Sequence, residues 1–371
     1  MSGVKIVKIK DYKENVREIF SALNFKIVSG EKILIKPNLV LPREAATGAT
    51  TDLDLISALI EIIKENKAIP ILAEGVGYEF DSRVFSILGI DKLVRKHDIQ
   101  FIDLRRSKTF FKKTPSPIFK KIELPEILKE VHKIINVPKL KTHMLTGFSC
   151  GLKNLIGLLP LKERRKMHLF GLARSIVELN LIIPTHLTIV DASVIMHGKG
   201  PAFGDRIKLG YLLAGLNVFA VDFSAAQFLN INPLEIGHLK IAKKRGLIPE
   251  DQKRQTKTED LSVVLPKNRF YNLLYWLVYF FDYLQEKITK KTSIAWWHRR
   301  FGMRPKLDIK KCHSFPACRD CLDICPVGAI KKETGLDFKK CAYIRCLKCF
   351  EVCPYEAIII KGISRPGQNN G

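Results

Sequence analysis

The chain has 371 residues, enough to bury a substantial core and to form two domains. Its 62 Lys and Arg outnumber 37 Asp and Glu, which gives a formal net charge of +25. Such a surface favours an anionic partner, although solvated surface lysines would give the same balance. The start, Met1–Lys5, shows no charged segment leading into an apolar one, so we expect no export signal and a cytoplasmic location.

Alternating strands and helices are predicted for the first 265 residues. Thr51 is expected to cap a helix that begins with two aspartates in its first turn. Helical patterns separate most of the strand-like apolar runs, which are residues 4–9, 32–35, 69–72, 99–102, 133–137 and 187–190. This order predicts an α/β domain with a mainly parallel sheet covered on both faces.

Eight of the nine cysteines lie in two similar runs near the C-terminal end: Cys312-x5-Cys318-x2-Cys321-x3-Cys325-Pro326 and Cys341-x4-Cys346-x2-Cys349-x3-Cys353-Pro354. A C-x2-C-x3-C loop brings its thiolates together on one small body, as a cubane cluster requires. Zinc knuckles normally lack a third cysteine followed by proline, and disulfides need a secreted context. Plain buried cysteines would not explain the repeat, so the spacing predicts iron–sulfur clusters.

The paired runs resemble the bacterial two-cluster ferredoxin module, apart from a longer first gap in each run. In that module the cysteine before proline usually reaches the other cluster. The resemblance implies a small ferredoxin-like α+β domain with two [4Fe–4S] clusters held by crossed sets of cysteines. The first set is Cys312, Cys318, Cys321 and Cys353, and the second is Cys341, Cys346, Cys349 and Cys325.

Polar residues gather where the predicted strands end, which is where ligands bind in open α/β sheets. The segments concerned are residues 35–40, 137–157, 190–204 and 219–222. Four lysines in them would form a cationic site for a phosphate or carboxylate: Lys36, Lys139, Lys141 and Lys153. The alternative is that these lysines simply lie on solvated loops.

Several further residues of these segments have possible roles in binding or catalysis. His143 and His168 could donate protons or bind a metal, and Asp191 could orient a histidine or hold a cation. Each histidine could equally donate to a backbone carbonyl. The loop that contains Gly198 and Gly200 could cradle an anion or be a tight turn. Cys150 is expected to be buried and inert.

The polar segments as a set resemble family 362 of the domains of unknown function, DUF362, whose members are often joined to a ferredoxin module. The resemblance covers roughly residues 30 to 225 and implies an α/β domain with a site, electron transfer through clusters and no assigned reaction. The matching residues are Lys36-Pro37-Asn38, Lys139, Lys141, Thr142, His143, Lys153-Asn154, Gly157, His168, Asp191, Gly198-x-Gly200-Pro201, Gly204 and Asp222.

An aromatic segment, Phe270–Phe281, lies between the two predicted domains, with lysines before and after it. Its uninterrupted apolar core of nine residues is too short to span a bilayer. Aromatic residues flanked by cations suit a helix that lies on an anionic membrane. The alternative is a helix buried between the domains or at a subunit contact.

We therefore expect an α/β domain over residues 1–265, a connector over 266–305, a ferredoxin domain over 306–361 and a flexible tail over 362–371. The predicted function is a reductase of a small anionic substrate that receives electrons from an external ferredoxin. One alternative is a non-catalytic electron carrier that docks on a larger, membrane-bound redox complex. Another is a nucleic-acid-binding protein with structural or sensory clusters, which the charge alone supports.

Overall fold

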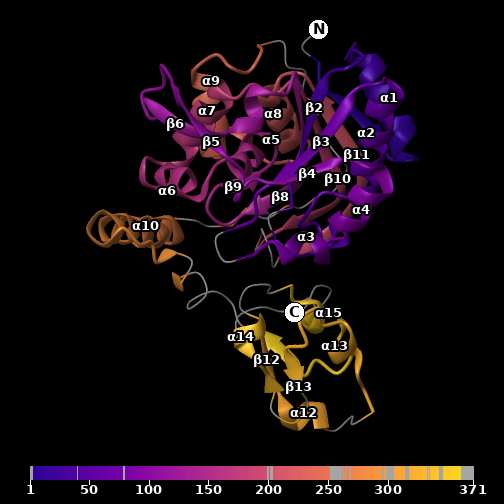
Figure 1. The fold of residues 1–371 in the computed structure, drawn as a ribbon, viewed down its shortest axis with the longest axis vertical. Helices are drawn as coiled ribbons and strands as arrows, with labels where there is room; N and C mark the ends of the chain where they lie inside the picture. The colour runs from indigo at the N-terminus through magenta and orange to yellow at the C-terminus, as the bar shows by residue number, and fades with distance from the viewer. Residues whose placement is uncertain are drawn as a thin grey trace.

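The computed structural model describes residues 3–39, 41–77, 80–198, 200, 204–250, 261, 263, 265–266, 269–294, 296–297, 305–313, 317–331, 333, 335–341 and 346–360. The predicted tail, residues 362–371, lies outside them, as do Lys199 and Pro201 of the glycine loop. The described chain forms a large α/β body, a helix at its side and a small cysteine-bearing body (Figure 1).

The α/β body is built on a nine-stranded sheet in the order β1-β11-β10-β7-β2-β3-β4, with β8 joined to β10 and β9 joined to β8. Its central strands run parallel, while β11 and β1 add an antiparallel edge and β9 pairs antiparallel with β8. The strands are β1 Lys5–Lys8, β2 Lys32–Pro37, β3 Ile69–Glu74, β4 Gln100–Asp103, β7 Lys133–Val137, β8 Lys139–His143, β9 Gly147–Ser149, β10 Leu187–His197 and β11 Asp205–Gly215. The prediction of an α/β domain with a mainly parallel sheet is confirmed.

Alternation along the buried strands divides the core into two layers. On β2, Ile33 and Ile35 pack into one layer and Leu34 into the other. One layer lies under α1 Tyr12–Ala22, α2 Leu53–Glu65, α3 Arg83–Ile87 and α4 Ile90–His97. The other contains α5 Gly151–Asn154, α6 Leu161–Leu169, α7 Leu172–Ile182, α8 Val218–Phe228 and α9 Gly237–Lys244, with the short β5–β6 hairpin, Thr109–Lys113 and Lys121–Pro125.

Two local expectations are wrong. The cap of α2 is Asp52, whose carboxylate accepts from Asp54 N–H, whereas the Thr51 hydroxyl donates to the carbonyl of Val137 at 2.7 Å. Residues 219–222 form part of α8 and do not end a strand, since Asn217 caps a helix directly before them. Their apolar run fits a helix that is buried nearly all round.

The small body has its own core, which includes Ile330, Phe350 and Ile358 beside three buried cysteines, Cys321, Cys349 and Cys353. Its elements are β12 Pro305–Leu307, α12 Ile309–His313, α13 Asp320–Asp323, β13 Ile330–Lys331, β14 Gly335–Leu336, α14 Phe338–Cys341, α15 Lys348–Val352 and β15 Ile358–Ile360. Strand β12 pairs with β15 and β13 pairs with β14, both antiparallel. The connector forms α10, Arg269–Thr289, which contacts α6.

Candidate functional site

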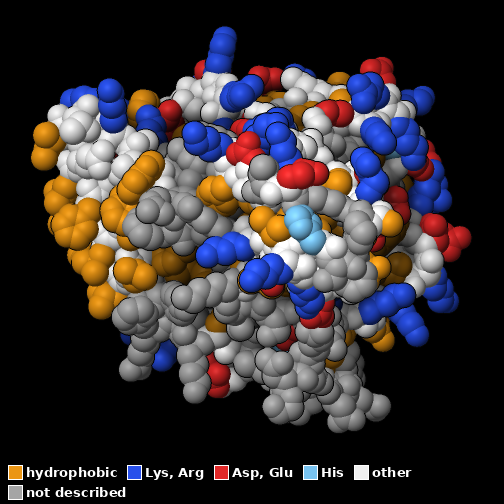
Figure 2. Space-filling view, turned by 90° about the horizontal axis from the view of Figure 1, so that it is seen from below, with side chains coloured by type: hydrophobic (Ala, Val, Ile, Leu, Met, Phe, Trp, Pro, Cys, Tyr) orange, Lys and Arg blue, Asp and Glu red, His pale blue; other side chains and the backbone are white. Residues whose placement is uncertain are grey.

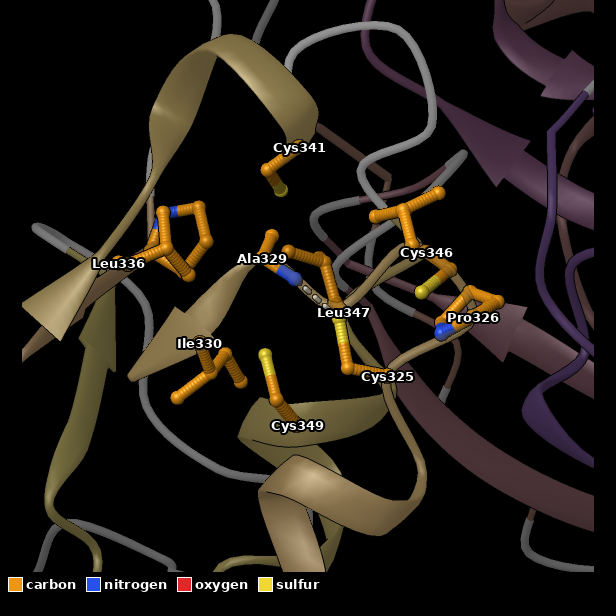
Figure 3. A pocket seen from close by; sticks show the side chains of 11 residues that line it. Cys325, Pro326, Ala329, Ile330, Leu336, Cys341, Cys346, Leu347 and Cys349 are labelled. Atoms are coloured by element: carbon orange, nitrogen blue, oxygen red, sulfur yellow. Dashed lines mark hydrogen bonds between the residues drawn. The ribbon is translucent and has the colours of Figure 1, made fainter. Parts of the chain in front are cut away.

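Four cysteines of the small body line one pocket, and their sulfurs point toward the space between them (Figure 3). They are Cys325, Cys341, Cys346 and Cys349. Three come from the second run, and Cys325 comes from the first. Apart from these cysteines, the lining is apolar and includes Ile330 and Leu347. The structure thus brings together the four residues of the second predicted set.

The surroundings of this pocket act on its sulfurs. Burial raises the pKa of the Cys349 thiol, and the neighbouring Cys346, Cys341 and Cys325 raise it further. The backbone N–H of Ala329 donates to Cys325 Sγ at 3.2 Å. Thiolates gathered in so apolar a place need a compensating positive charge, which a metal centre supplies.

The other four cysteines also lie near one another. Burial raises the pKa of Cys321, and Cys353, Cys312 and Cys318 raise it further. Cys353 of the second run thus lies with cysteines of the first. Within the described residues, no three His, Cys, Asp or Glu side chains are placed to hold a single metal ion.

In the α/β body, two of the four candidate lysines form fully buried ion pairs. Lys36 Nζ lies 2.8 Å from Glu74 Oε2, and Lys139 Nζ lies 2.8 Å from Asp191 Oδ2. A Cβ at Gly157 would lie 2.5 Å from Glu74 Oε1, so only glycine lets the chain pass over the first pair. Because their charges are balanced within the protein, Lys36 and Lys139 attract an external anion less than the sequence suggests.

Asp191 and the asparagines serve this buried network as well. Asp191 accepts from the backbone N–H of Asp52 at 2.8 Å and from the Ser193 hydroxyl at 2.6 Å. Asn154 donates to the carbonyls of Lys36 and Pro37 and accepts from Asn38 at 3.0 Å. These side chains hold the ends of the strands in register.

Lys141 and Lys153 differ, because neither forms an ion pair with a carboxylate among the described residues. Lys141 donates to Asn38 Oδ1 at 2.9 Å and to the carbonyl of Ala49, and burial lowers its pKa. Lys153 is half-buried, and desolvation lowers its pKa to about 8. Two cations without a described carboxylate partner, in a region that disfavours charge, form a place where an anion would be stabilised.

Two histidines, His143 and His238, adjoin these lysines, and His168 adjoins His143. Burial lowers the pKa of His143, and Lys153, Lys141, His168 and His238 lower it further. His168, on α6, stacks on Tyr279 of α10 with ring centroids 4.1 Å apart. The structure therefore brings His143 to Lys141 and Lys153, and His168 to His143.

His238 is a member of this group that the sequence did not reveal. Burial and then Lys153 lower its pKa to about 3, and neither ring nitrogen has a hydrogen-bond partner within the described residues. A buried ring without partners is available to a ligand or water. His238 lies on α9, outside the segments that resemble the family, so no pattern pointed to it. Glu74 ends β3 and could have been found from the strand-end rule.

The glycine loop is explained by packing as far as the structure describes it. The carbonyl of Gly198 accepts from the Thr142 hydroxyl at 3.3 Å. A Cβ at Gly200 would lie 2.2 Å from the Thr142 carbonyl oxygen, so this close approach requires glycine. Cys150 is buried, as expected, and burial raises its pKa, with Asp222 raising it further.

Charged contacts connect the cysteine-bearing body to the α/β body. Glu351, on α15 with Cys349, pairs with Arg43, and its Oε1 lies 3.0 Å from the guanidinium of Arg206. Lys348 lies 2.6 Å from Glu44. Arg43 belongs to the loop whose Ala49 carbonyl accepts from Lys141, so one short segment contacts both candidate sites.

Residues 33–227 match the family model of DUF362, a domain of unknown function. This match covers more than half of the chain, so the chain belongs to the DUF362 family, as its motifs predicted.

Two relatives are similar to different extents of the chain. The thylakoid-associated protein sll1697 of Synechocystis is 27% identical over 228 residues, which are 59% of this chain and 70% of that protein. Pyruvate synthase subunit PorD of Methanothermobacter marburgensis is 39% identical over 70 residues, which are 19% of this chain and 76% of that subunit. The solved structure of the lactate racemase apoprotein from Thermoanaerobacterium thermosaccharolyticum gives a TM-score of 0.41 at 15% identity, over 60% of this chain and 56% of that one.

Proposed function

We propose that the chain is an iron–sulfur oxidoreductase that takes electrons from an external ferredoxin-like carrier and reduces a small anionic substrate. The observation that carries this proposal is the ion pair of Arg43 and Glu351, because it fastens the Cys349 helix to the loop that contacts Lys141. A carrier alone has no need of two lysines without described carboxylate partners beside a group of histidines. The reaction would take its electrons from the carrier and its protons from the chain.

The cysteine pocket fits one of the two [4Fe–4S] clusters that the proposal requires. Its four residues belong to the crossed set of the ferredoxin module, and the sulfurs face a common space. The similarity to PorD over 70 residues supports an iron–sulfur link. When bound, such clusters would accept and donate single electrons. Cys312, Cys318, Cys321 and Cys353 would hold the second.

The α/β residues would bind the substrate and supply protons. Lys153 and Lys141 would hold a carboxylate or phosphate group by charge-assisted hydrogen bonds. Binding of that anion would raise the lowered pKa values of both lysines and of His143, since a negative charge favours their protonated forms. Protons taken up in this way could reach the substrate from His143, His168 or His238.

The proposal can be tested with anaerobic protein whose clusters have been reduced by dithionite. A panel of small carboxylates and inorganic phosphate would be added, and bleached cluster absorbance would be followed as it returns. We expect at least one compound to reoxidise the protein, and Lys153→Met to slow that reaction by tenfold or more. Lys162→Met, an exposed change on α6, is the control and should keep the full rate.

A non-catalytic carrier is the second candidate, favoured by the pairing of Lys36 with Glu74 and Lys139 with Asp191. In that case no compound would reoxidise the clusters, and Lys153→Met would leave electron transfer to a ferredoxin unchanged. This result would overturn the reductase proposal.

A further inference from the structure

Helix α10 turns its acidic side toward the protein. Asp282 is 1% exposed and accepts from Arg165 of α6 at 2.7 Å, and Glu286 pairs with the same guanidinium. About one turn before Asp282 on the same helix, Tyr279 is buried against His168. Ion pairs and one ring stack therefore fasten α10 to the α/β body through its polar side.

The opposite side of α10 is apolar and exposed. Ile288 is 82% exposed, Phe281 60% and Leu273 59%, and the remaining large apolar side chains exposed on this helix are Leu274, Trp276, Leu277 and Leu284. At about 100° per residue, these side chains span an arc of about 160°. Over Leu273–Gln285 the only charged residue is the buried Asp282. The polarity of this helix is thus the reverse of that of an ordinary surface helix.

Figure 2 shows this face beside the rest of the surface. Hydrophobic side chains gather at one side of the view, over α10, while lysines and arginines are spread over the rest of this face. Exposed apolar patches of such extent mark a contact with a membrane or a protein. Trp276 and Phe280 are stacked with centroids 5.1 Å apart, and such aromatic rings are enriched at membrane interfaces.

Charge decides between a lipid surface and a second copy. Two chains that each carry a formal charge of +25 repel one another, whereas an anionic bilayer attracts both. Lys287, Lys290 and Lys291 are exposed where α10 ends, at a position to meet lipid phosphates. None of the helices in the described residues has the length and hydropathy of a membrane span.

We propose that α10 lies in the surface of an anionic lipid bilayer, with its apolar face among the acyl chains and its acidic face on α6. The α/β body is then held at the membrane without a spanning segment. This inference does not depend on the proposed redox reaction, because no cysteine or lysine of that reaction takes part.

Tryptophan fluorescence is a selective probe, since all three tryptophans of the chain, Trp276, Trp296 and Trp297, lie on or just after α10. The full chain would be mixed with two kinds of vesicle, one of pure phosphatidylcholine and one that also contains about 30% of the anionic lipid phosphatidylglycerol. We expect a blue shift, quenching by brominated acyl chains and co-sedimentation with the anionic vesicles only. Rising salt should weaken the binding.

The matched variants are Leu277→Ser with Phe281→Ser on α10, and Leu181→Ser with Leu234→Ser elsewhere. All four side chains are exposed, so each pair should fold. The α10 pair should weaken binding about tenfold or more, and the control pair should not. Equal binding by both pairs would overturn the proposal. So would a dimer in light scattering that the α10 pair dissociates while vesicles remain unbound.

Discussion

Arg43 and Glu351 form an ion pair between the DUF362 domain and the cysteine-bearing body. Glu351 lies two residues after Cys349, and Arg43 lies near enough to Cys346 for that sulfur to act on its pKa, which burial lowers. A positive charge held there would stabilise the reduced, more negative state of a cluster in the pocket.

Removal of that charge gives the first prediction. Arg43→Gln should lower the reduction potential of one cluster by tens of millivolts, by an order-of-magnitude Coulomb estimate. A redox titration followed by EPR measures this directly. Arg17→Gln, an exposed change on α1, is the control. Equal potentials in wild type and Arg43→Gln would show that Arg43 does not act on the cluster.

The crossed sets of cysteines make the second prediction. Cys353→Ser should disturb the cluster of Cys312, Cys318 and Cys321, although Cys353 lies in the other run. Cys325→Ser should disturb the cluster of Cys341, Cys346 and Cys349. Mössbauer and EPR spectra of the two variants should therefore differ from each other in which centre is lost. If either variant instead loses the cluster that is held by the other three cysteines of its own run, the crossed arrangement is wrong.

The third prediction is a pH dependence. Lys153 has a pKa of about 8 in the folded chain and 10.5 ordinarily. An anion binds to the protonated amine, so the affinity of the chain for a small carboxylate ligand should fall about tenfold per pH unit above pH 8. Calorimetry between pH 7 and 10 measures it, and Lys153→Met should bind weakly at every pH.

The same shift has a consequence for the ligand-free chain. Between pH 8 and 10.5 the unfolded state holds more protons at Lys153 than the folded state does, so this group makes the free energy of unfolding rise with pH there. Lys153→Met should lack that rise. An identical slope in the variant would place the pKa of Lys153 near its ordinary value.

The fourth prediction concerns the buried pair of Lys36 and Glu74. Glu74→Gln leaves a buried ammonium without its counter-charge and should cost about 3–5 kcal/mol in the free energy of unfolding. Glu61→Gln breaks a solvent-screened surface pair with Lys13 and should cost far less. Urea titrations followed by circular dichroism compare the two. Similar small losses would mean that Lys36 finds another partner or is neutral.

Local patterns predicted the sheet because each buried strand carries its own apolar run and lies beside a similar one. Lys133–Val137 was predicted to the residue as β7. Strand β11, Asp205–Gly215, was missed because it is largely polar and exposed along its first half. It forms a hairpin with β10, directly before it in the chain, but its pairing with β1 joins residues about 200 positions apart, which no local pattern carries.

The sequence named many residues of the candidate site, but it did not predict how their charges are paired. The strand-end rule found all four lysines, but only three-dimensional contacts show that Glu74 and Asp191 neutralise two of them. His238 and the face of α10 depend on how distant helices pack, so the sequence could not assign them. The crossed sets of cysteines could be predicted, because the cysteine spacing and the resemblance to the ferredoxin module are both contained in two short runs of the chain.

The most direct test of the central claim is the metal content of anaerobically purified full-length protein. We expect about eight iron and eight sulfide per chain, with EPR signals from two coupled reduced cubanes after dithionite treatment. Stoichiometric zinc with no iron would contradict the account. So would iron for a single cluster, provided that a thiol count on the denatured protein shows that no cysteine has been oxidised.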